Sequence, residues 1–163
     1  MTDDNLLACS EQHIRAVFAM LGRQPKRPQF TGGLEAARLA PWHVDLLSDI
    51  RPERMYFAYD TKNDLEPLRC AGRMLAEAGF TRESRRVSAY VLIGYSGDSF
   101  SEAEQRLRKT WEVGFFPFAM LYHDESGQVE REWRQFQRSW AAPAAVGAQI
   151  ATRDLDAEEK NHQ

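Results

Sequence analysis

The sequence predicts an α/β fold, either an incomplete (β/α) barrel or a curved parallel sheet with helices on the outside. Three observations lead to this prediction. Short apolar runs each end in a polar or glycine-containing turn, a helix-like stretch follows each run, and the runs are too few to close an eight-stranded barrel. Because a helical crossover makes neighbouring strands parallel, we expect a parallel, open sheet. The four runs are Gln29–Glu35, Met55–Asp60, Val87–Asp98 and Phe115–Asp124.

The composition is that of one globular domain of 163 residues, with 43% hydrophobic residues and a formal net charge of −3. This charge argues against binding to nucleic acid through bulk positive charge. No apolar run approaches the roughly 20 residues of a membrane-spanning helix, and no signal peptide is evident. We therefore expect a cytoplasmic protein with neither membrane nor nucleic acid as partner. Residues 1–150 would form the domain and residues 151–163 a flexible charged tail.

The chain begins with a segment, Thr2–Asn5, that looks like the end of a strand whose beginning is missing. A helix is expected over Glu11–Arg23, because apolar residues recur there at helical spacing behind a capping Ser10. The first complete strand then leads into a glycine turn at residues 32 and 33. The first edge of such a sheet needs a cover, so we expect a partner chain or a missing N-terminal segment to supply it.

The middle of the chain predicts helix, strand and helix in turn. A helix is expected within Ala36–Ile50. The continuous apolar run Met55–Tyr59 indicates a strand that is covered on both faces. The helix expected over Asp64–Ala78 would begin with Asn63 and Glu66 at capping-box spacing.

The second half of the chain repeats the pattern. The expected elements are a strand over Val87–Ile93, a helix over Phe100–Val113, a strand over Phe115–Tyr122, a helix over Glu130–Trp140 and a weaker helix to Ile150. The first of these helices can begin with a capping box, formed by Ser99 and Glu102 or by Ser101 and Glu104. Beyond Thr152 the sequence is charged and poor in apolar residues, which predicts a frayed tail.

Polar and glycine residues gather where the strands end, and the carboxyl ends of parallel strands share one rim. The rim residues are Asp3, Asp4, Asn5, Gly32, Gly33, Glu35, Arg38, Asp60, Gly94, Gly97 and Asp98. Exposed backbone N–H groups beside glycine can hold a carboxylate, and side-chain carboxylates can accept from an ammonium group or ribose hydroxyls. Together these groups favour a zwitterionic nucleoside such as S-adenosylmethionine over a triphosphate. The alternative is that each glycine only forms a turn and each aspartate only caps a helix.

Several strand ends, in their order and spacing, resemble those of the radical SAM superfamily. The matching stretches are Asp4–Ala8, Phe30–Ala36, Phe57–Thr61 and Tyr90–Ser99. The last is the most specific, because Gly94–Ser99 resembles the Gly-x-Pro-Gly-Asp/Glu-Thr turn that follows the fifth strand in that family, with Ser96 replacing the proline. The likeness covers about Asp3 to Trp140 and corresponds to the downstream part of that family's partial barrel.

The resemblance implies a ligand and a cluster. In that family a [4Fe–4S] cluster on three cysteines cleaves S-adenosylmethionine to a radical. By position, Ile93 and Gly94 would lie near adenine. The methionyl and ribose groups would lie near Asp4, Gly32, Gly33, Glu35 and Arg38. The family's C-x3-C-x2-C loop is missing, and the only cysteines are Cys9 and Cys70. We therefore predict that this chain alone binds no cluster, offers no metal site and is inactive.

Three functions are compatible with these features. The chain can be a fragment or one half of a split radical SAM enzyme, with its catalytic residues unassigned. It can instead be a non-catalytic binding or scaffolding module derived from that barrel. The third reading is a β/α enzyme that uses Asp60 and Asp98 for acid–base chemistry, and it is the weakest because no His or Lys pairs with them at a readable spacing.

Overall fold

The computed structural model describes residues 5–123, 127 and 129–160. Its centre is one open sheet of four parallel strands in the order β1-β2-β3-β4. The strands are β1 (Gln29–Leu34), β2 (Arg54–Tyr59), β3 (Val87–Ile93) and β4 (Phe116–Leu121). The predicted parallel α/β fold is confirmed. The sheet is not closed, so the structure gives an open sheet and not a complete barrel.

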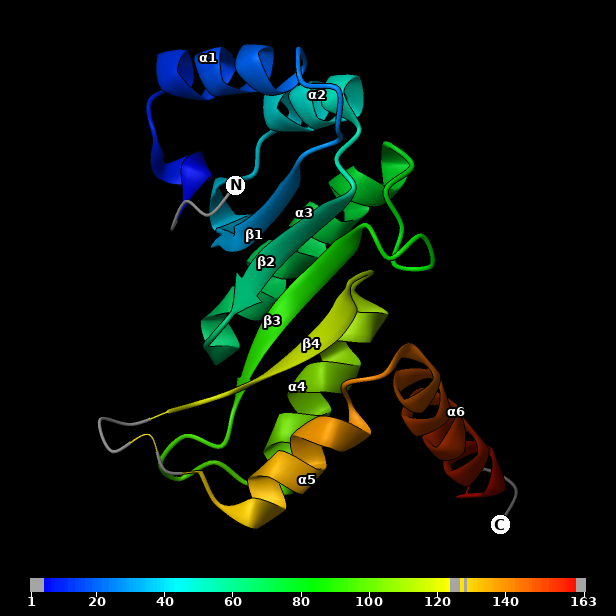
Figure 1. Ribbon diagram of the computed structural model, residues 1–163. Helices are drawn as coiled ribbons and strands as arrows, with labels where there is room; N and C mark the ends of the chain where they lie inside the picture. Colours follow the sequence, from blue (N-terminus) through cyan, green and yellow to red (C-terminus); the bar gives the residue numbers. More distant parts are fainter. Residues whose placement is uncertain (1–4, 124–126, 128, 161–163) are drawn as a thin grey trace.

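Helices connect the strands along one face of the sheet (Figure 1). The helices are α1 (Glu11–Leu21), α2 (Pro41–Ile50), α3 (Leu65–Glu77), α4 (Phe100–Glu112), α5 (Arg131–Ser139) and α6 (Pro143–Lys160). Three short 3-10 turns accompany them, namely η1 (Leu6–Ala8), η2 (Ala36–Arg38) and η3 (Lys62–Asp64). Helices α2, α3 and α4 contact one another in sequence order, as right-handed crossovers between adjacent parallel strands require.

The core lies between this helical layer and the sheet. Along each strand, alternate residues point to the helices, and in β2 these are Met55, Phe57 and Tyr59, all at most 2% exposed. In β3 the same face carries Val87, Ala89, Val91 and Ile93. Leu68 and Leu75 of α3 and Leu107 of α4 are fully buried against them. The period-two alternation therefore assigns one face of the sheet to the core.

The second face of the sheet is open in the part of the chain that the structure describes, and Figure 1 looks onto it with α3 and α4 behind the strands. It carries Tyr56, Tyr90 and Phe118, whose rings contact one another. Phe118 and Met120 are 42% and 37% exposed. The expectation that Met55–Tyr59 is covered on both faces is therefore wrong for the described residues. The run is continuously apolar because Tyr56 belongs to an aromatic cluster on the open face.

Two positions on the outer edge of β4 cannot pair fully with another strand. Tyr122 donates its N–H to the carbonyl of Ile93 in β3. Because backbone groups alternate in direction along a strand, the even-numbered residues of β4 bond to β3 and the odd-numbered residues direct their N–H and C=O groups away from it. Among them Pro117 has no N–H, and the carbonyl of Ala119 accepts from Nε2 of Gln137 on α5 at 3.0 Å. Proline and a side-chain bond thus occupy the edge, as is common where a strand must not recruit another.

Element boundaries differ from the prediction at three places. Asn5 lies outside any strand and is followed by η1, so the expected strand end is not seen there, while residues 2–4 lie outside the described residues. Helix α3 begins at Leu65, because the side chain of Asp64 bonds back to Thr61 and forms η3 first. Helix α6 runs to Lys160, past the expected end at Ile150. The capping alternative at Ser99 and Glu102 is the one that forms.

Within the described residues, none of the helices combines the length and the apolar character needed to cross a lipid bilayer.

Candidate functional site

A pocket of about 400 Å³ opens at the carboxyl ends of the strands, on the open face of the sheet. We call it the rim pocket. All four strands or the loops after them contribute to its wall. The wall includes Asn5, Gly32, Gly33, Glu35, Ala58, Asp60, Asp64, Pro67, Tyr90 and Met120. Its position follows the general rule that sites in parallel sheets lie beyond the carboxyl ends of the strands.

Glu35 is held in place at one side of the rim pocket. It accepts a hydrogen bond from Nδ2 of Asn5 at 2.7 Å and a charge-assisted bond from Nε of Arg38. The bond from Arg38, followed by the bond from Asn5, holds the pKa of Glu35 below its ordinary value. Glu35 therefore stays ionised and keeps a fixed negative charge at the pocket.

Asp60 and Asp64 supply two further carboxyl groups. Oδ2 of Asp64 accepts from the N–H of Thr61 at 2.7 Å, from its hydroxyl at 3.0 Å and from the N–H of Asp60 at 3.1 Å. Asp64 is thus fixed by the turn. The carboxyl group of Asp60 receives no hydrogen bond from any described residue, and burial, followed by the charge of Asp64, raises its pKa. Asp60 is consequently the acid that a cationic ligand would stabilise most.

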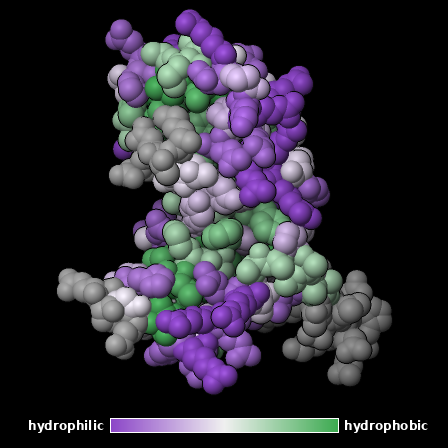
Figure 2. Space-filling model, in the orientation of Figure 1, coloured by the Kyte–Doolittle hydropathy of each residue, from purple (hydrophilic) through white to green (hydrophobic). Residues whose placement is uncertain are grey.

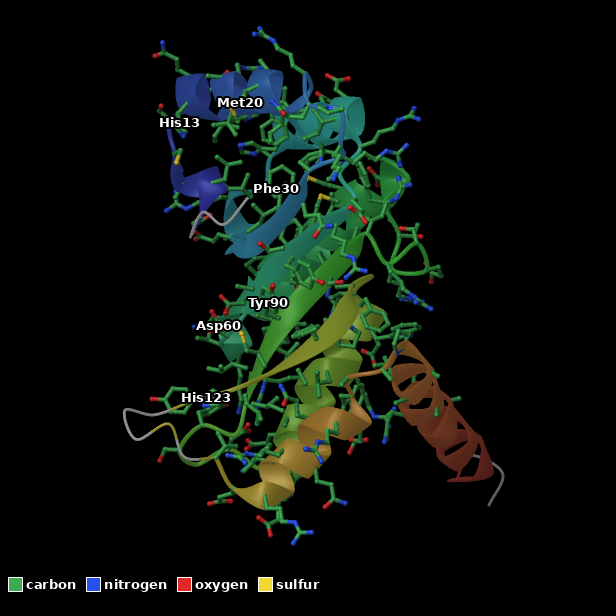
Figure 3. The ribbon with its side chains drawn as sticks, viewed as in Figure 1. His13, Met20, Phe30, Asp60, Tyr90 and His123 are labelled. Carbon is green, nitrogen blue, oxygen red and sulfur yellow. The ribbon has the colours of Figure 1, made fainter. Side chains whose placement is uncertain are left out.

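The floor of the rim pocket is apolar and aromatic. The hydroxyl of Tyr90 donates to the carbonyl of Thr31 at 3.1 Å, and its ring stacks on Tyr56 with centroids 4.7 Å apart. Figure 3 shows Tyr90 in the middle of the sheet and Asp60 beyond the end of β2. Gly33 has a φ of 82°, and a Cβ there would lie within 4.0 Å of Ala58 and Tyr90. A Cβ would fit at these distances, so the positive φ and not a lack of space is what favours glycine at position 33.

A second hollow of about 570 Å³, lined in part by Gly94, Gly97, Asp98, Tyr122 and Trp133, follows β3 and β4. In this hollow the carboxylate of Asp98 stabilises the loop that follows β3. The side chain of Asp98 is fully buried and accepts from the N–H of Gly94 at 2.8 Å and from Nη2 of Arg106 at 2.7 Å. Gly94 has a φ of 75°, and a Cβ there would meet the indole of Trp133 at 3.1 Å. These contacts build the loop and leave the carboxylate of Asp98 occupied.

The predicted site residues therefore divide between places. The rim pocket brings together Asn5, Gly32, Gly33, Glu35 and Asp60, with Arg38 bonded to Glu35 beside it. Gly94, Gly97 and Asp98 line the second hollow. Ile93 is fully buried in the core, on the helix-facing side of β3. Asp4 lies outside the described residues. Asp60 and Asp98 do not share one pocket.

Sequence reasoning missed Asp64, Tyr90 and Met120 as pocket residues. The spacing of Thr61 and Asp64 is that of a capping pair, which could have placed Asp64 in the turn after β2. Period-two alternation in β3 could have placed Tyr90 opposite the buried Ala89 and Val91. The same alternation in β4, where Pro117 and Ala119 are buried, could have placed Met120 on that face.

No protein-family model, curated protein or solved structure matches the chain. In the described residues no group of three or more His, Cys, Asp and Glu side chains is arranged to hold a metal ion. The fold and the site define the class plainly: an α/β domain with an open parallel sheet, helices on one face and an acidic pocket at the carboxyl ends of the strands.

Proposed function

We propose that the chain binds a cationic nucleoside of the S-adenosylmethionine type in the rim pocket, as the ligand-holding part of a radical SAM-like partial barrel. One observation carries the proposal. Glu35, Asp60 and Asp64 place three carboxyl groups around one pocket, and none of the described residues in its wall is a Lys or a His. Among the described residues, Arg38 forms an ion pair with Glu35, while Lys62 beside Asp60 and Asp64 pairs with Glu102 instead. An acidic pocket favours a ligand with an excess of positive charge.

The match in charge is specific to the sulfonium form of this ligand. S-adenosylmethionine carries an ammonium, a sulfonium and a carboxylate, so it has a net positive charge. Asp60 is the acid best placed to gain from that charge, because no described donor occupies it and a cation would lower its raised pKa. Gly32 and Gly33 line the pocket, and backbone N–H groups beside glycine would suit the ligand carboxylate.

The size and floor of the pocket also support the proposal. A volume of about 400 Å³ lies in the range of small-molecule sites. Tyr90 and Met120 give an aromatic and polarisable surface for a purine or a methionyl chain. The second hollow is not needed for this role, since Asp98 is engaged by Arg106.

A [4Fe–4S] cluster does not fit this chain. Three thiolates are needed to hold three irons and leave the fourth for S-adenosylmethionine, and the sequence has two cysteines. Cys70 is moreover exposed on α3, on the helical side of the sheet and not in the rim pocket. We therefore derive no radical step, and the proposed role is to bind and orient the ligand.

Calorimetric titration of the full chain tests the proposal. S-adenosylmethionine should bind, and S-adenosylhomocysteine, which lacks the sulfonium charge, should bind about five- to tenfold more weakly, as expected for roughly 1–1.4 kcal/mol from one partly exposed charge pair. Asp60→Asn should weaken S-adenosylmethionine by a similar factor. Glu77→Gln, at the exposed end of α3, is the matched control and should change nothing. Equal affinity for the two ligands, or no binding, contradicts the proposal.

The second candidate is a non-catalytic binding or scaffolding module. The open aromatic face of the sheet favours it, because all-parallel sheets are nearly always covered on both faces. This role predicts a folded, monodisperse chain that does not bind S-adenosylmethionine, and the same titration separates it from the first candidate.

A further inference from the structure

The open face of the sheet carries opposite charges at its two ends. The open-face residues of β2, read in chain order and on to the turn that follows, are Arg54, Tyr56, Ala58 and Asp60. Figure 2 shows this face with pale and green residues across the middle and purple side chains above and below. The face therefore runs from a cation through an aromatic centre to an acid.

The basic end is reinforced by a second arginine. Met55 pairs with Val87 across the sheet, so Arg54 lies opposite Arg86, whose carbonyl accepts from the N–H of Met55 at 2.7 Å. Neither guanidinium has a carboxylate within ion-pair distance among the described residues. Like charges directly opposite each other destabilise a pair of strands. Two adjacent arginines without an ion pair therefore give this end of the apolar face a positive charge, which would attract an acidic surface.

The apolar centre is suited to contact with another sheet. Phe118 and Met120 stand out from β4 and remain 42% and 37% exposed. The rings of Tyr56 and Tyr90 support Phe118 edge-on, with centroids 6.0 and 5.5 Å away. The face is thus apolar at the level where β2, β3 and β4 pair, with Ala58 opposite Tyr90 and Tyr90 opposite Phe118.

We infer that the open face is the interface of a two-fold symmetric homodimer, in which two copies pack face to face with their strands antiparallel. A two-fold axis across the strands, near the level of Tyr56 and Ala58, brings Arg54 of each copy over Asp60 of the other. An axis along the strands would instead place arginines over arginines. The opposite charges at the two ends of the face therefore favour a second copy of the chain as the partner and an antiparallel arrangement of the two sheets.

The size of the face sets the strength of the contact. Four strands about 4.8 Å apart and six residues long at about 3.3 Å each span an area of roughly 20 by 20 Å. A standard interface buries about 800 Å² on each partner, so this one is small. The dimer is accordingly reversible and dependent on concentration. The proposed dimer contact needs no bound ligand, although it shares Asp60 with the rim pocket.

Sedimentation velocity on the full chain without ligand tests the inference through a charge swap. The wild type should show a monomer–dimer equilibrium. Arg54→Glu and Asp60→Arg should each weaken the dimer roughly tenfold or more, because the two-fold axis repeats each lost contact. The double variant with both substitutions recreates attraction across the axis and should regain the dimer. Arg73→Glu, on the exposed side of α3, is the control and should leave the equilibrium unchanged.

Two outcomes would overturn the homodimer. One is a wild type that remains monomeric at its highest workable concentration. The other is a charge swap with the wrong result: either both single variants still dimerise like the wild type, or the double variant stays monomeric although thermal melting shows that it is folded. Ligand titration plays no part in these readings, so the dimer can fail while the nucleoside proposal stands, and the reverse.

Discussion

At the scale of single residues, the buried pair of Asp98 and Arg106 shows how the loop after β3 is fixed. Their side chains are 0% and 6% exposed, and Nη2 of Arg106 also donates to the carbonyl of Leu92 at 3.0 Å. Nε and Nη1 of Arg106 are buried without a partner in the described part of the chain. The guanidinium therefore depends on Asp98 for its charge balance, and the loop depends on both.

Removing the acid of this pair should be costly. Asp98→Asn leaves a buried guanidinium uncompensated, so we expect the free energy of unfolding to fall by about 3–5 kcal/mol. Chemical denaturation measures the loss. Adding Arg106→Met should recover much of it, since no charge then remains buried. If Asp98→Asn alone costs less than about 1 kcal/mol, which is the value of an exposed pair, the buried pair is not structural.

His43 gives the fold a dependence on pH. It is 4% exposed, and its Nδ1 accepts from the N–H of Ala40 at 3.0 Å, so the neutral ring carries its proton on Nε2. Burial lowers the pKa of His43, with Glu11 opposing this shift and Arg15 adding to it. A pKa lower in the folded than in the unfolded state means that acid favours unfolding.

The expected result is a loss of stability as the pH falls below the unfolded value of about 6.5 toward the lower pKa of the folded chain. Urea midpoints measured across this range check the slope. His43→Asn keeps an acceptor near Ala40 but cannot take up the proton, so its midpoints should depend less on pH. His13→Asn, on the exposed side of α1, should leave the slope unchanged.

At the scale of elements, one glycine sets how closely α3 approaches the end of α4. A Cβ at Gly72 would lie 2.0 Å from the carbonyl oxygen of Val113 and 3.1 Å from the ring of Phe115. The backbone of α3 thus lies directly against the turn that leads into β4. No other side chain fits there, because the obstacle is backbone and cannot rotate away.

The same substitution in two helices should therefore have opposite effects. Gly72→Ala forces α3 away from Val113, and we expect a loss of roughly 1–3 kcal/mol or more. Gly147→Ala, in α6, has nothing within 4 Å of its new methyl group and should stabilise by up to about 0.5–1 kcal/mol. Thermal unfolding of both variants measures the contrast. Equal effects would show that α3 can shift freely.

Element order could be predicted from the sequence, and local turn chemistry explains where the boundaries moved. Apolar runs located β2, β3 and β4, whereas β1 was placed by its glycine turn and by the helices on either side of it. The start of α3 moved because the side chain of Asp64 bonds to Thr61, a choice between nearby caps that spacing alone does not settle. The open face could not be predicted, because Tyr56 and Phe57 are equally compatible with a buried strand.

At the scale of the whole molecule, the rim pocket and the open face meet at Asp60. The sequence located five of the pocket residues by placing the strand ends on one rim. It also grouped them with Gly94 and Asp98, which the structure assigns to another hollow. Topology brings strand ends to one edge, but the curvature of the sheet decides which ends share a pocket, and curvature has no signal in the local sequence.

If both proposals hold, ligand and dimer compete for Asp60. Occupancy of both copies then opposes association, so the apparent dimer dissociation constant should rise about 100-fold at a ligand concentration nine times its dissociation constant. Sedimentation velocity with and without S-adenosylmethionine measures this shift, and S-adenosylhomocysteine at the same concentration should shift it less. An unchanged dimer in the presence of bound ligand would show that Asp60 serves only one of the two roles.

The outer edge of β4 affects whether copies of the chain can associate by adding strands to the sheet. With Pro117 lacking a donor and the carbonyl of Ala119 taken by Gln137, an incoming chain finds no continuous ladder to extend on that side. Growth into fibrils by strand addition at β4 is therefore disfavoured, even though an exposed aromatic face lies beside it. Association would therefore use the open face of the sheet and not the edge of β4. Two-fold symmetry on that face limits the proposed assembly to two copies, whereas strand addition at an edge could continue without limit.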